Sequence, residues 1–116
     1  MPFDHERLDV YQTALEWLVI ADDIVQHLPR GRSHLADQLT RAATSIVLNI
    51  AEGAGKYSKG DKRRYYISAA GSTTECAAIC DVCLRLELIT AGCHQETKDL
   101  LERIMSMLVK LARSQE

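Results

Sequence analysis

The sequence predicts an all-α fold: one domain over residues 1–116, folded as an up-down-up-down antiparallel four-helix bundle. Apolar residues recur every three to four positions through four long segments, and no segment shows the alternating pattern of a strand. Glycine and proline lie between these segments, so short loops join the helices and place successive helices antiparallel. The 116 residues, 47% hydrophobic and 5% aromatic, are enough for one core of aliphatic helix contacts.

The first helix is expected over residues 4–28, and Pro29 ends it because proline disfavours helical geometry in the residue before it. Its apolar residues form two rows, Leu8, Tyr11, Leu15, Leu18, Val25 and Leu28 in one and Val10, Ala14, Trp17, Ala21 and Ile24 in the other. The two rows make a broader apolar face than a lone surface helix needs. The second helix is expected over residues 34–54, with Ser33 as its N-cap and the glycines Gly53 and Gly55 at its end.

The third helix is expected over residues 59–89. Ser58, with Asp61 three residues later, predicts a capped start. Its contact row is made almost entirely of small residues: Tyr66, Ala69, Thr73, Cys76, Cys80 and Cys83. Small side chains let helix axes approach closely, and we interpret Gly71 as part of such a contact. Thr90-Ala-Gly92 is expected to end this helix, and the fourth helix follows over residues 94–113.

Charge is distributed unevenly along the chain, although the net charge is only −2. Residues 4–23 hold six acidic residues against Arg7 alone, whereas residues 56–64 hold five basic residues against Asp61. No window approaches the roughly 18 apolar residues of a membrane span, and the N-terminus lacks the apolar run of a signal peptide. We therefore expect a soluble, cytoplasmic protein without membrane association.

Two groups of residues suggest a metal site or catalysis, and neither fits in detail. Cys76-x-x-x-Cys80-x-x-Cys83 has the spacing of the cluster-binding cysteines in radical S-adenosylmethionine enzymes, but here it lies within a predicted helix. Three thiolates spread over about 10 Å of helix would not converge on one cluster, so we interpret them as core residues. Glu52 and Glu75 suggest half of a di-metal site, yet neither has a histidine three residues later. We expect no metal, no cofactor and no catalytic residue.

Polar residues form a stripe on each of the two central helices. The stripes consist of Ser45, Asn49 and Glu52 on the second helix and Ser68, Ser72 and Glu75 on the third. Buried polar groups need hydrogen-bond partners, and networks of such groups fix the register of packed helices. We therefore expect these six residues to form a structural polar network.

The basic turn, defined as residues 56–64, is the best candidate for binding another molecule. Its cations are Lys56, Lys59, Lys62, Arg63 and Arg64, and tyrosines lie among and after them. Cations near a helix N-terminus oppose the helix dipole, and a nucleic-acid backbone would offset that cost. Exposed tyrosines could stack on bases. The alternatives are a solvated loop, or ion pairs with the acidic first helix of the same or a neighbouring chain.

The central residues resemble the signature of a known family. They read Gln38-Leu-x-Arg41-Ala-Ala-x-Ser45-Ile-x-x-Asn49-Ile-Ala-Glu52-Gly53, followed by Ser58, Tyr66, Ala69 and Gly71-Ser72-x-x-Glu75. With the opening Phe3-x-x-x-x-Leu8-x-Val10-Tyr11-Gln12-x-Ala14, the pattern covers essentially the whole chain. It resembles the bacterial four helix bundle protein family, whose members were first noticed as reading frames within intervening sequences of large-subunit ribosomal RNA genes.

The resemblance implies a protomer of a homopentameric, barrel-like ring, and it brings no enzymatic activity. It also implies kinship with the accessory variability determinant of diversity-generating retroelements, a basic pentamer that binds nucleic acid and its reverse transcriptase. By position, the nucleic-acid-facing residues would be Arg41, Lys56, Lys59, Lys62, Arg63 and Arg64. The present chain departs from those relatives in its slightly acidic net charge.

We therefore expect a non-enzymatic homo-oligomer, pentameric by resemblance, that serves as a scaffold or adaptor. Its partners would be further copies of itself and, by family kinship, RNA, DNA or a reverse transcriptase. The alternative function is an RNA- or DNA-binding accessory factor that uses the basic turn.

Overall fold

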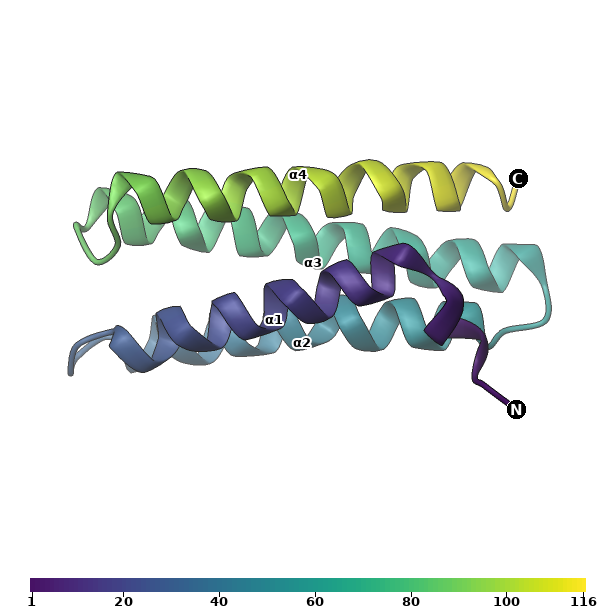
Figure 1. Ribbon diagram of the computed structural model, residues 1–116, viewed down its shortest axis with the longest axis horizontal. Coiled ribbons are helices and arrows are strands. Elements are labelled where there is room, and N and C mark those ends of the chain that lie inside the picture. Colours follow the sequence, from purple (N-terminus) through teal and green to yellow (C-terminus); the bar gives the residue numbers. More distant parts are fainter.

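Four antiparallel α-helices make up the structure, a computed structural model that describes all 116 residues, 1–116 (Figure 1). A short 3-10 helix, η1 (Asp4–Arg7), precedes α1 (Asp9–His27), α2 (Ser33–Ala54), α3 (Lys59–Arg85) and α4 (Ala91–Arg113). The bundle is 44 Å long, and both termini lie at the end that also carries the α2–α3 turn. The predicted four-helix bundle is thus confirmed.

Each helix packs against two neighbours, and α2 lies diagonally across the bundle from α4. The core is aliphatic around one tryptophan, and its largest fully buried side chains include Trp17, Leu39, Ile46, Ile50, Ile104 and Leu108. Helix α3 contributes the small contact row predicted from the sequence, every member of which is buried. On α1 the row that contains Trp17 faces the core, whereas the row that contains Leu15 is only partly buried.

The first helix is shorter at its start than the expected residues 4–28. Leu8 is extended, with φ −88° and ψ 125°, and separates η1 from α1. Two ring contacts hold this break, Phe3 with His5 at 5.6 Å and His5 with Tyr11 at 4.6 Å between centroids. At the other end, Leu28 is extended as expected for a residue before proline.

The expectation that Ser33 caps the second helix is wrong. Ser33 is already helical, and the N-cap is Arg32, whose side chain makes no capping hydrogen bond. Gly31 has φ +91° and allows the chain to reverse, after which the Arg32 N–H donates to the Pro29 carbonyl. The helix therefore begins one residue earlier than the preference of serine for the N-cap position suggests.

The third helix ends at Arg85, four residues before the expected 89. Glu87 adopts a left-handed conformation with φ +61°, a geometry that usually selects glycine. The Leu88 N–H donates to the Cys83 carbonyl at 2.8 Å and the Glu87 N–H to the Leu84 carbonyl at 3.0 Å, which is a Schellman motif. Leu88 then packs against the core, and this contact accounts for a helix stop that no glycine marks.

Thr90 begins the fourth helix rather than ending the third, so the expected start at residue 94 is also wrong. Its side chain accepts a hydrogen bond from the Cys93 N–H at 3.0 Å, and α4 begins at Ala91. The predicted cap of α3 is confirmed, because the Ser58 hydroxyl oxygen accepts from the Asp61 N–H at 3.1 Å.

The close contact between α2 and α3 occurs at Gly53 and not at Gly71. A Cβ atom placed on Gly53 would lie 2.8 Å from Cε1 of Tyr66 and 3.0 Å from Cβ of Tyr65. A Cβ on Gly71 would meet no atom within 4 Å, and Gly71 is exposed. The interpretation of Gly71 as a packing residue is therefore wrong, and Gly53 has that role because α3 presents tyrosines there.

The four cysteines are free, and three of them are core residues. Burial raises the pKa of Cys76 and of Cys80 from 9.0 to about 12, although the nearby Trp17 indole opposes the rise at Cys76. Burial also raises the pKa of Cys83 and of the half-buried Cys93. These thiols are protonated at neutral pH, as expected of small apolar core residues.

The two glycines should respond in opposite directions to alanine. Gly53→Ala should lower the free energy of unfolding by roughly 1–3 kcal/mol, because the new methyl group overlaps Tyr66. Gly71→Ala should raise it by about 0.5–1 kcal/mol, because alanine favours helix at an open position. Urea unfolding followed by circular dichroism, at one fixed protein concentration, measures both. Shifts of the same sign and size would contradict the assigned contact.

Glu87→Gly should stabilise the protein by about 1 kcal/mol, since glycine adopts the left-handed conformation without the clash of a Cβ atom. Glu87→Ala serves as the control, because it removes the same carboxylate but keeps the Cβ atom. If both variants gain equally, charge and not backbone conformation is responsible.

The buried thiols should be protected from alkylation. In the native protein at about pH 8, iodoacetamide should modify Cys93 first and leave Cys76 and Cys80 unmodified, because the reactive species is the thiolate. In the folded protein the pKa of Cys76 and of Cys80 is about 12, against the ordinary value of 9.0. The contribution of these two thiols to the free energy of unfolding is therefore complete below pH 9.0 and is lost as the pH rises towards about 12. Mass spectrometry after labelling tests the protection, and Cys93→Ser is the control. Labelling of Cys76 as fast as in guanidinium would disprove it.

Candidate functional site

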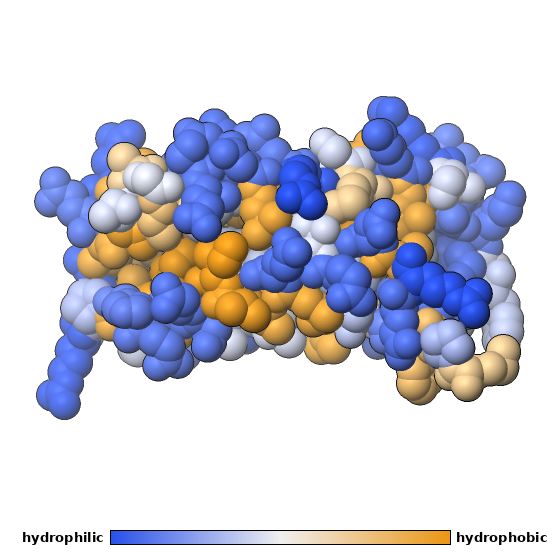
Figure 2. All heavy atoms as spheres, viewed as in Figure 1, coloured by the Kyte–Doolittle hydropathy of each residue, from blue (hydrophilic) through white to orange (hydrophobic).

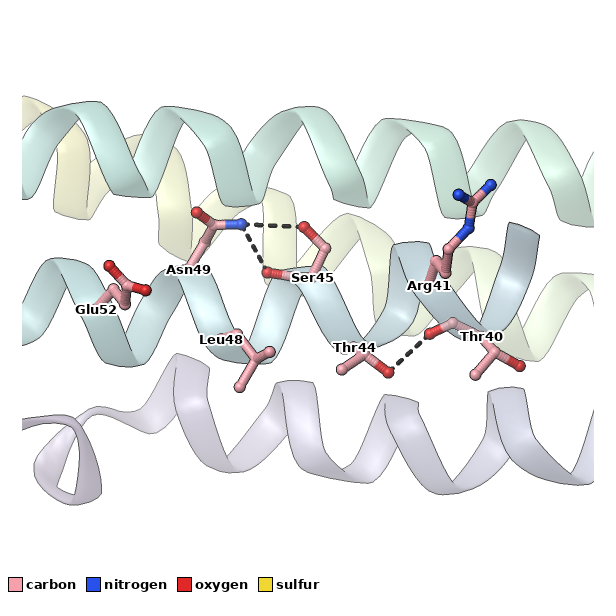
Figure 3. Close-up of a pocket in the computed structure, with 7 residues that line it drawn as sticks. All are labelled: Thr40, Arg41, Thr44, Ser45, Leu48, Asn49 and Glu52. Carbon is pink, nitrogen blue, oxygen red and sulfur yellow. Dashed lines mark hydrogen bonds between the residues drawn. The ribbon is translucent and has the colours of Figure 1, made fainter. Parts of the chain in front are cut away.

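An open hollow lies on the outer side of α2 and contains much of the sequence signature. It has a volume of about 380 Å³ and is lined by Thr40, Arg41, Thr44, Ser45, Leu48, Asn49 and Glu52, all from α2 (Figure 3). In Figure 3, Arg41, Ser45 and Asn49 point towards α3, whereas Thr40, Thr44 and Leu48 point towards α1. Leu48 is 57% exposed. The hollow is therefore a surface with an apolar side chain within it, and not an enclosed cavity.

Three of the six residues of the expected polar network are joined by hydrogen bonds. The Asn49 amide donates to the Ser45 hydroxyl at 3.0 Å and to the Ser45 carbonyl at 2.9 Å. Ser45 and Ser72 lie 2.8 Å apart through their hydroxyl oxygens. Because the Ser45 oxygen accepts from Asn49, its own hydrogen is available for Ser72. This contact is a hydrogen bond between two side chains, one on α2 and one on α3.

The other three residues, Glu52, Ser68 and Glu75, are exposed and make no side-chain hydrogen bond. The Ser45–Ser72 contact fixes the register, and in antiparallel helices it places Glu52 at the level of Tyr65. Glu75 is ten residues further along α3, about 15 Å along the helix axis. Two carboxylates so far apart cannot act together on one bond. The hydrogen-bonded network is therefore smaller than expected, and the two glutamates do not form a catalytic pair.

Most cations of the basic turn contact groups of their own chain. The Lys62 ammonium donates to the Ala54 carbonyl at 2.7 Å and so satisfies a free carbonyl at the C-terminus of α2. Lys56 and Arg64 both lie over the Tyr65 ring, 5.1 and 5.4 Å from its centroid. The dipole of α2 favours a cation at this end, which offsets the unfavourable effect of the same cations on the start of α3.

The two arginines of the turn also have carboxylate neighbours. Arg63 lies 3.7 Å from Glu116, and Arg64 lies 3.5 Å from Asp61. Among the turn's five cations, Lys59 makes none of these contacts. Beside it, Tyr57 is fully exposed. The intramolecular alternative is thus partly realised, although the partners are Ala54, Tyr65, Asp61 and Glu116 and not the acidic first helix.

The structure does not bring Arg41 to the basic turn. Arg41 is thirteen residues before the end of α2, so it lies about 20 Å from the turn along the helix axis. It lines the α2 hollow instead, together with Glu52. The six residues that family kinship places against nucleic acid therefore occupy two separate surfaces.

Leu48 is the residue of this surface that sequence reasoning missed. It lies between the core positions Val47 and Ile50 but outside the apolar row, and this offset is the signal that could have identified it. No group of three or more His, Cys, Asp or Glu side chains is arranged to hold a metal ion. None of the helices combines the length and the apolar character that crossing a membrane requires.

Comparison with known proteins supports the fold and the family. A crystal structure at 1.70 Å resolution, of a protein with unknown function from the S23 ribosomal protein family of Bacteroides thetaiotaomicron, superposes with a TM-score of 0.83. The two sequences are 22% identical, and the match covers 89% of this chain and 97% of the other. No curated protein matches the chain significantly. A family model described as 23S rRNA-intervening sequence protein matches residues 6–110. Because that match spans most of the chain, this protein belongs to the 23S rRNA-intervening sequence protein family.

Proposed function

We propose that this protein is a non-catalytic subunit of a homo-oligomer that serves as a scaffold or adaptor, with the outer face of α2 as a contact between subunits. One observation carries the proposal: the signature residues of α2 line an open surface around the exposed Leu48. Residues that act in catalysis would instead be expected to line a concave site with convergent titratable groups. The family resemblance suggests five subunits.

The composition of this face supports a protein partner. Leu48 supplies apolar area, Thr40, Thr44 and Ser45 are small and neutral, and the charged Arg41 and Glu52 lie at opposite ends. An apolar centre with a polar rim is the usual anatomy of a protein interface. The hydrogen bonds around Ser45 hold the surface rigid, so little side-chain freedom would be lost on association.

Binding of RNA or DNA through the basic turn is the second candidate function. The observation that favours it is that Tyr57 is fully exposed, and that Lys59, two residues later, makes none of the contacts described for the other four cations. The other cations of the turn already contact groups of their own chain, and non-specific binding depends on neutralising several phosphates. We therefore rank this function below self-association.

Leu48→Asp should dissociate the oligomer. The wild type should sediment as a multiple of 13.0 kDa, about five-fold if the family resemblance holds. An aspartate at the contact would leave an unpaired charge in the interface, which costs roughly 3–5 kcal/mol per contact. Val109→Asp is the matched control, because Val109 is also exposed, at 37%, but lies on α4 across the bundle. Sedimentation velocity gives the mass, and circular dichroism checks that both variants are folded.

A wild type that is monomeric at about 100 µM would reject the proposal, since a stable assembly requires tighter association. An oligomer that survives Leu48→Asp but not Val109→Asp would reject the α2 face as the contact. Titration with a labelled RNA tests the second candidate function, nucleic-acid binding, independently of self-association. Binding that weakens steeply with salt and is lost in Lys59→Glu would establish it.

A further inference from the structure

Helices α1 and α4 meet along an open groove, here called the α1/α4 seam. Figure 2 views the bundle from this side, and apolar atoms show between α4 above and α1 below, with hydrophilic side chains on both flanks. Two hollows lie in the seam. One, of about 350 Å³, is lined by Leu8, Asp9, Val10, Met107, Lys110, Leu111 and Ser114, and the other, of about 270 Å³, by Glu16, Ile20, Glu96, Asp99, Leu100 and Arg103.

The spacing of the hollows matches three turns of an α-helix. On α1, Val10 and Ile20 are ten residues apart, and on α4, Leu100 and Leu111 are eleven apart. Both intervals correspond to about 15 Å along a helix axis. Residues eleven apart differ by about 20° around a helix axis and residues ten apart by about 80°, so either pair lies on the same side of a helix. A further helix in the seam could therefore place one apolar side chain in each hollow.

The hollow at Ile20 and Leu100 is acidic. Glu16, Glu96 and Asp99 line it against the single cation Arg103, and none of the three carboxylates forms a salt bridge. The hollow at Val10 is balanced, with one acidic and one basic residue. The occupant should therefore be basic at one end, and an acidic surface repels nucleic acid and anionic lipid.

A second copy of this chain does not match the seam. Its exposed large apolar residues on helices are Val19 on α1, Leu48 on α2, Ile67 and Val82 on α3, and Val109 on α4. No helix presents two of them ten or eleven residues apart. On α1 the partly buried Leu15 and Val25 are ten residues apart, but the acidic Glu16, Asp22 and Asp23 lie beside them in the sequence, and an acidic hollow would repel that helix. The occupant is therefore a segment of a different protein.

We propose that the α1/α4 seam binds an amphipathic helix of a partner protein, with two apolar anchors ten or eleven residues apart and lysine or arginine beside the anchor that enters the Ile20–Leu100 hollow. This is recognition of a helix in a groove, with charge setting its direction. The inference goes beyond the proposed self-association and does not depend on it, because it uses a different surface.

A labelled synthetic helix tests the proposal on the full chain. The probe is a fluorescein-labelled peptide of about 18 residues, with two leucines eleven residues apart, three lysines beside one of them, and alanine and glutamine elsewhere. Fluorescence anisotropy at low salt should show saturable binding to the wild type. A peptide with glutamates in place of the lysines, and one with the leucines seven residues apart, should bind at least about ten-fold more weakly.

Protein variants locate the site. Glu16→Lys combined with Asp99→Lys should weaken binding of the basic peptide at least about ten-fold and restore binding of the glutamate peptide. Glu75→Lys combined with Glu87→Lys is the matched control, because it makes the same charge change at two exposed residues outside both the seam and the α2 surface. It should leave the affinity unchanged.

The proposal is overturned if the wild type does not bind the basic peptide, or if the two double variants bind it equally. It is also overturned if the seam variant changes the sedimentation mass, because the seam would then be a subunit contact. Failure of the proposed self-association is seen separately, as a monomeric wild type that still binds the peptide.

Discussion

The close packing of α2 against α3 is the constraint on which the rest of this structure depends. Gly53 lies against Tyr65 and Tyr66, where even one added carbon would come within 2.8 Å of a ring atom. The small contact row of α3 and the hydrogen bond between Ser45 and Ser72 continue the contact along the two helices. Shape and hydrogen bonding together define one register, because a shift of one residue would separate the hydroxyl pair and move a tyrosine onto a residue with a side chain.

That register also determines what the basic turn can do. With the two helix ends so close, Lys62 reaches the Ala54 carbonyl, and Lys56 and Arg64 both reach the Tyr65 ring. Cations that looked free in the sequence therefore stabilise the end of α2. The surface of α2 that turns away from these contacts holds Leu48, and we propose this surface for self-association.

Helix α1 is held less closely, which explains why its apolar face is broader than the core requires. Its Trp17 row fills the interior, whereas Leu15 and Ile20 in other rows are only partly buried. The remaining apolar area lies partly along the α1/α4 seam, beside acidic residues. One bundle thus carries two surfaces of different character, a neutral one on α2 and an acidic, apolar one between α1 and α4.

The sequence by itself determined the number of helices, their order and most of the core, because the period of apolar residues follows directly from helix geometry. It also determined the family, and the caps that depend on neighbouring residues, such as Ser58 with Asp61. The tertiary structure decided where α3 ends, since Glu87 takes a left-handed conformation only because Leu88 is drawn into the core. It decided as well that Gly53 and not Gly71 is the contact glycine, and that Ser45, Asn49 and Ser72 are joined while Glu52, Ser68 and Glu75 are not. These outcomes depend on which side chain of a neighbouring helix lies against each residue. The spacing of residues along the sequence does not specify that contact.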